Sequence, residues 1–164
     1  EALDLRARTG VRLNIEVKEE SARGDGSALE LGRMIAEMDL YGHVVVSSFN
    51  PMALARVRSR CPAPLGLLYP SSGTGVRDRL TRRPWASSIL SLYALHPSVN
   101  VVTAEGVRKA HLRGLGVNVW TVNSEAKMRE LAGWQINGMI TDHPDVAMNV
   151  VLELDALKGN QATL

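Results

Sequence analysis

Hydrophobic and polar residues alternate strictly over eight positions near the start of the chain, from Val11 to Lys18. A period of two predicts a β-strand with two unlike faces. One face is aliphatic, and the other carries Arg12, Asn14, Glu16 and Lys18. A sheet covered on both sides would bury these charges at a cost unless something pairs with them. Two interpretations follow: a barrel strand whose polar face meets a metal and a phosphate, or an edge strand with a solvated face.

The rest of the chain alternates short apolar runs with amphipathic segments. Further strands are expected at residues 43–49, 65–69, within 92–102, and at 117–122 and 138–141. Helices are expected at residues 27–40, from 51 to about 61, at 85–92, 104–113, from 124, and at 144–157. Six β/α units in sequence predict a parallel sheet, either open and doubly wound or part of a (β/α)8 barrel. Because no glycine-rich phosphate loop follows the first strand, a dinucleotide-binding fold is disfavoured.

Local signals mark several helix starts. Asn50 before Pro51 is typical of an N-cap followed by proline at the first helical position. Thr103 is expected to cap the helix at 104–113, and Asp25 or Ser27 to cap the helix at 27–40. The inward stripe of that last helix is expected to be Leu31, Met34, Ile35 and Met38.

Composition narrows the class of protein. With 164 residues, 45% of them hydrophobic, the chain is expected to form a single domain spanning residues 1–164. A net charge of +2 and 4% aromatic residues argue against nucleic acid as a partner. The single cysteine, Cys61, excludes an internal disulfide and fits a cytoplasmic location. No apolar run is long enough for a transmembrane segment.

Three segments carry a more specific signal: residues 13–18, residues 44–51, and residues 114–123 leading to 138–144. In this order and spacing they resemble the glycerophosphodiester phosphodiesterase family, over a span from about Val11 to Val151. The resemblance implies a partial (β/α)8 TIM-type barrel that holds strands three to eight, without the first two β/α units. It also implies metal-dependent hydrolysis of a glycerophosphodiester to sn-glycerol 3-phosphate and an alcohol, and hence a place in lipid and glycerol metabolism.

The family's opening segment carries a His-Arg pair, a Glu-x-Asp and a second histidine. The residues before Val11 hold no counterpart of these groups. One expectation is therefore a truncated enzyme that is inactive alone. The alternative is a non-catalytic α/β module, derived from the same barrel, that binds a phosphate or a protein. Unpaired first and last strands would also invite self-association.

The resemblance assigns roles to three residues. Glu16 would be a ligand of a divalent cation, Ca²⁺ or Mg²⁺, and Lys18 would contact the phosphate. Trp120 would line the substrate mouth beside the glycerol moiety. Each assignment has a structural alternative. Glu16 could form an ion pair with Lys18 or Arg12, and Lys18 could be an ordinary surface lysine. Trp120 could be a core aromatic residue.

Histidines are the natural candidates for acid–base work. His96 and His143 are both candidate mouth residues, although a structural role is favoured for each. His43 begins a strand and so lies at the wrong end of a barrel, whose sites sit at the carboxyl ends of the strands. His111 is expected on the surface of an outer helix.

The remaining candidates are polar residues in loops. Asn123 is a possible substrate contact, but a helix cap is favoured for it. Asp142 could reach a metal and is likewise expected to cap the last helix. An arginine-rich loop at residues 77–83 could cover an anionic headgroup, with a solvated loop as the favoured interpretation.

Overall fold

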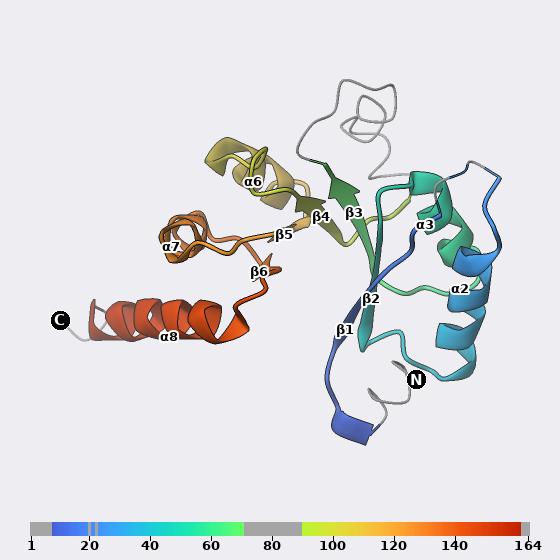
Figure 1. The fold of residues 1–164 in the computed structure, drawn as a ribbon, viewed down its shortest axis with the longest axis horizontal. Helices are drawn as coiled ribbons and strands as arrows, with labels where there is room; N and C mark the ends of the chain where they lie inside the picture. Colours follow the sequence, from blue (N-terminus) through green and yellow to red (C-terminus); the bar gives the residue numbers. More distant parts are fainter. Residues whose placement is uncertain (1–7, 20, 22, 71–89, 162–164) are drawn as a thin grey trace. The chain divides into compact units, whose positions relative to one another are not determined.

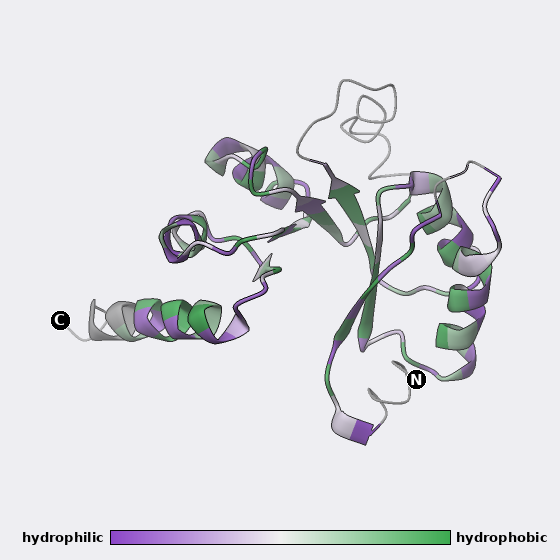
Figure 2. Ribbon diagram, in the orientation of Figure 1, coloured by the Kyte–Doolittle hydropathy of each residue, from purple (hydrophilic) through white to green (hydrophobic). Residues whose placement is uncertain are grey.

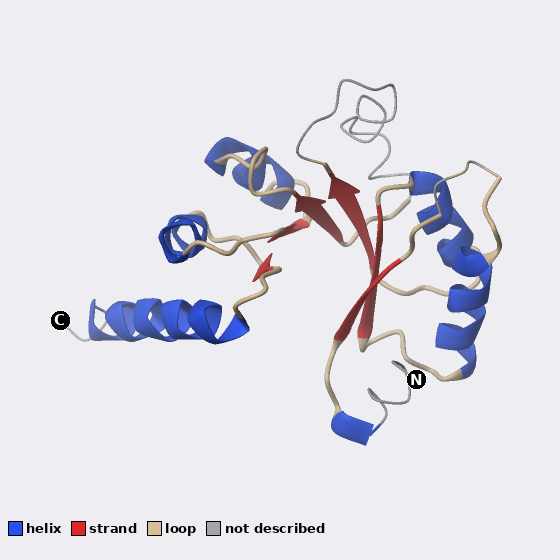
Figure 3. Cartoon of the chain, in the orientation of Figure 1, coloured by secondary structure: helices blue, strands red, loops and turns tan. Residues whose placement is uncertain are grey.

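The computed structural model describes residues 8–19, 21, 23–70 and 90–161. The chain divides into two compact units, Glu1–His96 and Pro97–Leu164, and the fold of each is given separately. Strands and helices alternate along both units (Figures 1 and 3). None of the helices in the described residues is both long enough and apolar enough to cross a membrane.

The first unit is built on parallel strands that neighbour one another in chain order. These are β1 (Leu13–Glu16), β2 (Val44–Ser48), β3 (Leu65–Tyr69) and β4 (Ala94–Pro97), the last ending at the boundary between the units. Register places Ile15 opposite Val46, and Val46 opposite Leu65. Apolar residues run along β2 and β3 (Figure 2). Every strand predicted in this unit is present, although β1 is shorter than the alternating segment.

Helices α2 (Ser27–Glu37) and α3 (Pro51–Arg58) lie side by side and complete the core of the first unit (Figure 1). The predicted inward stripe of α2 is wrong in part, because Met34 and Met38 are exposed. Its buried residues are Ala28, Gly32 and Ile35. A Cβ added at Gly32 would lie 2.8 Å from the Cβ of Arg60. Close approach to the end of α3 therefore selects the small-residue face of α2.

The second unit contains α6 (Ala104–His111), β5 (Gly116–Val119), α7 (Glu125–Gly133), β6 (Gly138–Met139) and α8 (Pro144–Gln161). Strands β5 and β6 pair in parallel, and α7 packs against α8. Met128 and Leu131 are fully buried and form the inward face of α7. Thr103 caps α6 as predicted, since its Oγ1 accepts a hydrogen bond from the amide of Gly106 at 3.1 Å.

Two predictions fall partly or wholly outside the described residues. The arginine-rich loop at 77–83 and most of the predicted helix at 85–92 belong to the undescribed range 71–89. The described end of that helix, from Leu90 to Leu92, has no helical structure. The last helix extends beyond its predicted end at Leu157 and reaches Gln161.

Candidate functional site

Parallel register assembles a row of polar and small residues across the first unit. Glu16 on β1 lies opposite Ser47 on β2, and Ser47 lies opposite Gly66 on β3. The imidazole of His96 on β4 covers Gly66, because a Cβ added there would lie 2.5 Å from its Nε2. Glycine at this position thus leaves the space that the ring fills. We call Glu16, Ser47, Gly66 and His96 the polar layer.

Beside the polar layer, β1 presents an open charged face. Arg12, Glu16 and Lys18 are all exposed, and Glu16 and Lys18 are two residues apart, about 7 Å along an extended chain. Within the part of the chain that the structure describes, none of these three side chains forms an ion pair. The ion pair that competed with a metal role for Glu16 is therefore absent from this face. A carboxylate and an ammonium that have no ion-pair partner among the described residues are suited to binding charged ligands.

The other end of the polar layer is enclosed. His96 is 1% exposed, and this burial lowers the pKa of its imidazole to about 4. The ring is therefore neutral at pH 7, with one nitrogen able to donate a hydrogen bond and the other able to accept one. Ser47 is fully buried, and its Oγ has no hydrogen-bond partner among the described residues. The layer thus combines an open carboxylate, a buried hydroxyl and a neutral imidazole.

A divalent hard cation requires about six oxygen ligands. In the described ranges, no three His, Cys, Asp or Glu side chains converge into a group that could hold a metal ion. Glu16 suits such an ion as one ligand, and its exposure leaves the carboxylate accessible. These residues alone do not form a complete cation site.

In the second unit, Trp120 follows β5 and is half-buried. Its amide donates a hydrogen bond to the carbonyl of Pro97 at 3.1 Å, and its own carbonyl accepts one from the amide of Val99 at 2.6 Å. The peptide bond that joins it to Thr121 is cis. The two hydrogen bonds to Pro97 and Val99 fix the position of Trp120 at the carboxyl end of β5.

The cap predicted for Asn123 is wrong, because Ser124 occupies the N-cap position of α7. The side chain of Asn123 instead joins the loop after β5 to the loop after β6. Its Nδ2 donates to Oδ2 of Asp142 at 2.7 Å, and its Oδ1 accepts from the amide of Asp142 at 3.0 Å. The carboxylate of Asp142 is thereby engaged with Asn123 instead of capping α8. His143 follows in the same loop and is exposed.

The other two histidines lie away from strand ends that could carry a site. His43 is exposed and lies immediately before β2, so the strand begins one residue later than predicted, and His43 is at its amino end. His111 is exposed on α6, which confirms its predicted surface position. Its Nε2 lies 3.0 Å from Oδ1 of Asn137, which also accepts a hydrogen bond from the amide of Val117.

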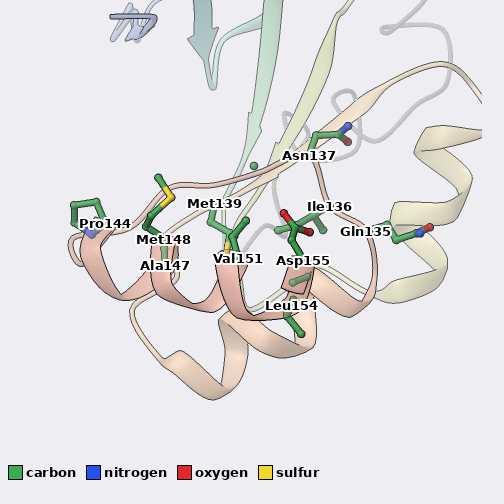
Figure 4. Close-up of a pocket in the computed structure, with 12 residues that line it drawn as sticks. Gln135, Ile136, Asn137, Met139, Pro144, Ala147, Met148, Val151, Leu154 and Asp155 are labelled. Carbon is green, nitrogen blue, oxygen red and sulfur yellow. The ribbon is translucent and has the colours of Figure 1, made fainter. Parts of the chain in front are cut away.

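A groove of about 570 Å³ lies in the second unit, between the end of α7, β6 and α8. Its lining includes Ile136, Met139, Met148 and Val151 (Figure 4). The lining contains no lysine, arginine or histidine, and none of the predicted site residues. A charged phosphodiester would find no cationic partner in this groove.

The geometry of β1 and the polar layer can be set beside known proteins. Residues 1–146 match the model of the glycerophosphoryl diester phosphodiesterase family. The chain belongs to this family. A glycerophosphodiester phosphodiesterase from Caldanaerobacter subterraneus subsp. tengcongensis is 29% identical over 141 residues, covering 85% of this chain and 55% of that protein. The chain thus spans about half the length of this curated relative.

Solved structures agree with the family. A protein from Silicibacter pomeroyi DSS-3, assigned to the glycerophosphoryl diester phosphodiesterases, is similar with a TM-score of 0.79 and 26% identity. The match covers 94% of this chain and 55% of that one. A phosphodiesterase from Oleispira antarctica has the same fold, with a TM-score of 0.70 and 21% identity, covering 92% of this chain and 59% of its own. The fold class is therefore the predicted partial TIM-type α/β barrel of this family.

Three residues near the site have a place there that only the structure shows. Ser47 and Gly66 complete the polar layer, and the glycine inside the apolar strand β3 was a usable signal of close approach. Glu19 is the third of these residues. Its buried carboxylate accepts a hydrogen bond from the amide of Ala28 at 3.0 Å and pairs with Nη1 of Arg56 at 2.8 Å.

Glu19 also corrects the predicted cap of α2. The N-cap residue is Gly26, which has no side chain. Asp25 accepts a hydrogen bond from the amide of Ser27, and no other amide of the first turn bonds its carboxylate among the described residues. The carboxylate of Glu19 reaches the first turn of α2 from the loop after β1. A negative charge at a helix N-terminus is stabilising there.

Proposed function

We propose that this chain contributes Glu16 and Lys18 to the active site of a phosphodiesterase that hydrolyses glycerophosphodiesters to sn-glycerol 3-phosphate and an alcohol. The observation that carries the proposal is the open face of β1, where both charges lie without an ion-pair partner among the described residues, in a chain of this family. The related phosphodiesterase from Oleispira antarctica was solved in complex with the product sn-glycerol 3-phosphate, which supports this choice of substrate class.

Each residue has a role that suits its chemistry. The ammonium of Lys18 would contact phosphate oxygens and offset the charge that develops on the phosphoryl group. Glu16 would supply one oxygen ligand to Ca²⁺ or Mg²⁺, with further carboxylates from outside the described residues. Such a cation, when bound, polarises the phosphoryl oxygens. Trp120 would pack against the glycerol moiety.

The histidines contribute differently. A pKa of about 4 keeps His96 as the neutral imidazole at pH 7 and not the acidic imidazolium, so it would not be a general acid. The general acid and base would come from residues outside those described. His143 and Asn123 lie in loops at the carboxyl ends of β6 and β5 and stay candidates for substrate contact. The alternative of a non-catalytic module is not favoured, because the named relatives are enzymes.

The test is hydrolysis of glycerophosphocholine, with Ca²⁺ or Mg²⁺, by the polypeptide that the gene encodes and by the 164-residue chain. Lys18→Met is expected to lower kcat/KM by roughly 100-fold or more, as loss of a charge-stabilising donor does. Glu16→Gln is expected to weaken Mn²⁺ binding measured by calorimetry, independently of turnover. Lys109→Met and Glu37→Gln remove exposed helix charges and serve as matched controls. Full activity and unchanged metal binding in both site variants would contradict the proposal.

Two further features stay proposals. Among the described residues, β1 pairs with β2 and β6 pairs with β5, so each offers an edge through which two copies of the chain could associate. Light scattering after size exclusion would detect such association. The buried free thiol of Cys61 fits a cytoplasmic location, which fractionation of the host cell would test.

A further inference from the structure

The backbone that carries Lys18 lies beyond the end of β1, yet it is tied down. Strand β1 ends at Glu16. The amide of Val17 then donates to the carbonyl of Ser47 at 2.8 Å, and the carbonyl of Val17 accepts from Oγ of Ser48 at 2.7 Å. Both polar backbone groups of the residue before Lys18 are thus bonded to the end of β2. Loop residues at this point of a β/α unit are ordinarily more mobile.

Asn50 fixes the residue on the other side of Lys18. Its Nδ2 donates to the carbonyl of Glu19 at 2.8 Å and to the carbonyl of Ser21 at 3.2 Å. The same side chain accepts from the amide of Met52 at 3.0 Å through Oδ1, which caps α3. One buried amide therefore caps a helix with its oxygen and holds the loop after β1 with its nitrogen.

Ser48 and Asn50 act together, because the amide of Asn50 donates to Oγ of Ser48 at 3.0 Å. Both side chains are nearly fully buried, so water cannot replace their hydrogen bonds without cost. We define the pair Ser48 and Asn50 as the clamp.

We propose that Ser48 and Asn50 are positioning residues, which hold the backbone at Val17, Glu19 and Ser21 so that Glu16 and Lys18 project from a fixed frame. This inference rests on the proposed function of Glu16 and Lys18. It assigns a purpose to the segment at residues 44–51, which the catalytic roles above leave unexplained. Lysine has a long flexible side chain, so a fixed backbone removes part of the ordering that ligand binding would otherwise require.

The chain offers closely matched variants. Ser47→Ala and Ser48→Ala remove the same hydroxyl from adjacent buried positions, but only Ser48 Oγ bonds the loop. Asn50→Asp keeps the oxygen that caps α3 and removes the amide donor. Asn50→Ser is a second capping variant that is too short to reach the loop carbonyls. Thr103→Ala removes the cap of α6 in the second unit and controls for general destabilisation.

The first readout is hydrogen exchange of the Val17 amide, which bonds the carbonyl of Ser47, in the 164-residue chain, compared with exchange of β3 amides. Ser48→Ala and the Asn50 variants are expected to speed exchange of the Val17 amide by roughly 5- to 13-fold relative to β3, since a lost hydrogen bond is worth about 1–1.5 kcal/mol. Ser47→Ala and Thr103→Ala are expected to leave this ratio unchanged. An unchanged ratio in Ser48→Ala and in both Asn50 variants would overturn the clamp.

The second readout separates the clamp from the proposed function. In the polypeptide that the gene encodes, Asn50→Asp is expected to lower kcat for glycerophosphocholine roughly 10-fold, consistent with a small misplacement of the reacting groups, while Thr103→Ala leaves it unchanged. Full activity in Asn50→Asp together with loss in Glu16→Gln would overturn the positioning role. Full activity and unchanged metal binding in both Glu16→Gln and Lys18→Met would instead refute the proposed function, and hydrogen exchange would still decide the clamp.

Discussion

Acidification should destabilise this protein through His96 in particular. Burial lowers the pKa of His96 to about 4 in the folded chain, against 6.5 for an ordinary histidine. Between these two values the unfolded chain binds more protons than the folded chain, so the free energy of unfolding falls as the pH falls. The loss begins below about pH 6.5 and is complete near pH 4.

The magnitude follows from the two pKa values. A tenfold change in proton affinity is worth about 1.4 kcal/mol, so the full loss is about 3 kcal/mol. Roughly 2 kcal/mol of it should be lost between pH ~7 and pH ~5. For a small domain this is a substantial part of a total stability of about 5–15 kcal/mol.

Two measurements check this prediction. Nitrogen chemical shifts of the imidazole report the pKa of His96 directly, and urea unfolding at a series of pH values reports the free energy. In His96→Gln, the fall in unfolding free energy between pH ~7 and pH ~5 should be smaller than in the unsubstituted chain by about 2 kcal/mol. In His43→Gln, at an exposed position, the fall should be the same as in the unsubstituted chain. A measured pKa near 6.5, or an unchanged pH dependence in His96→Gln, would show that water reaches the ring and that the polar layer is not closed around it.

Three substitutions test other parts of the packing. Gly66→Ala places a Cβ 2.5 Å from Nε2 of His96, so it should cost about 1–3 kcal/mol by denaturant unfolding, and a neutral effect would mean that the ring is free to move. Glu19→Gln leaves the guanidinium of Arg56 without its carboxylate and should lower the free energy of unfolding by about 2 kcal/mol. This is less than for a fully buried pair, because the side chain of Arg56 is 18% exposed. A double-mutant cycle with Arg56→Met that gives no coupling would refute this. Thr103→Ala should cost about 1 kcal/mol of unfolding free energy, unless another group caps α6.

Features that depend on neighbours in the chain could be predicted from the sequence. The period of two across β1, the apolar runs of β2 and β3, and the caps at Asn50 and Thr103 are all local. Each rests on backbone geometry within a few residues, where the alternatives are few. The order of these elements, with the three family segments, was enough to predict the fold class and to single out Glu16 and Lys18.

Features that join distant parts of the chain needed the tertiary structure. Asn123 bonds Asp142, 19 residues away, instead of its own helix, and Glu19 pairs with Arg56, 37 residues away. Neither partner could be predicted, because a polar side chain near a helix start can form either a local or a distant hydrogen bond, and the two are similar in free energy. Packing of the folded chain decides which one forms.

Strand register decided the polar layer. The sequence by itself determined that β1 has a polar face, but the neighbours of Glu16 on that face depend on how β2 and β3 slide against it. A shift of one residue would turn Ser47 and Gly66 to the opposite face and remove the space that His96 fills. Register is specified by which face of each strand is buried, and that burial exists only in the folded chain.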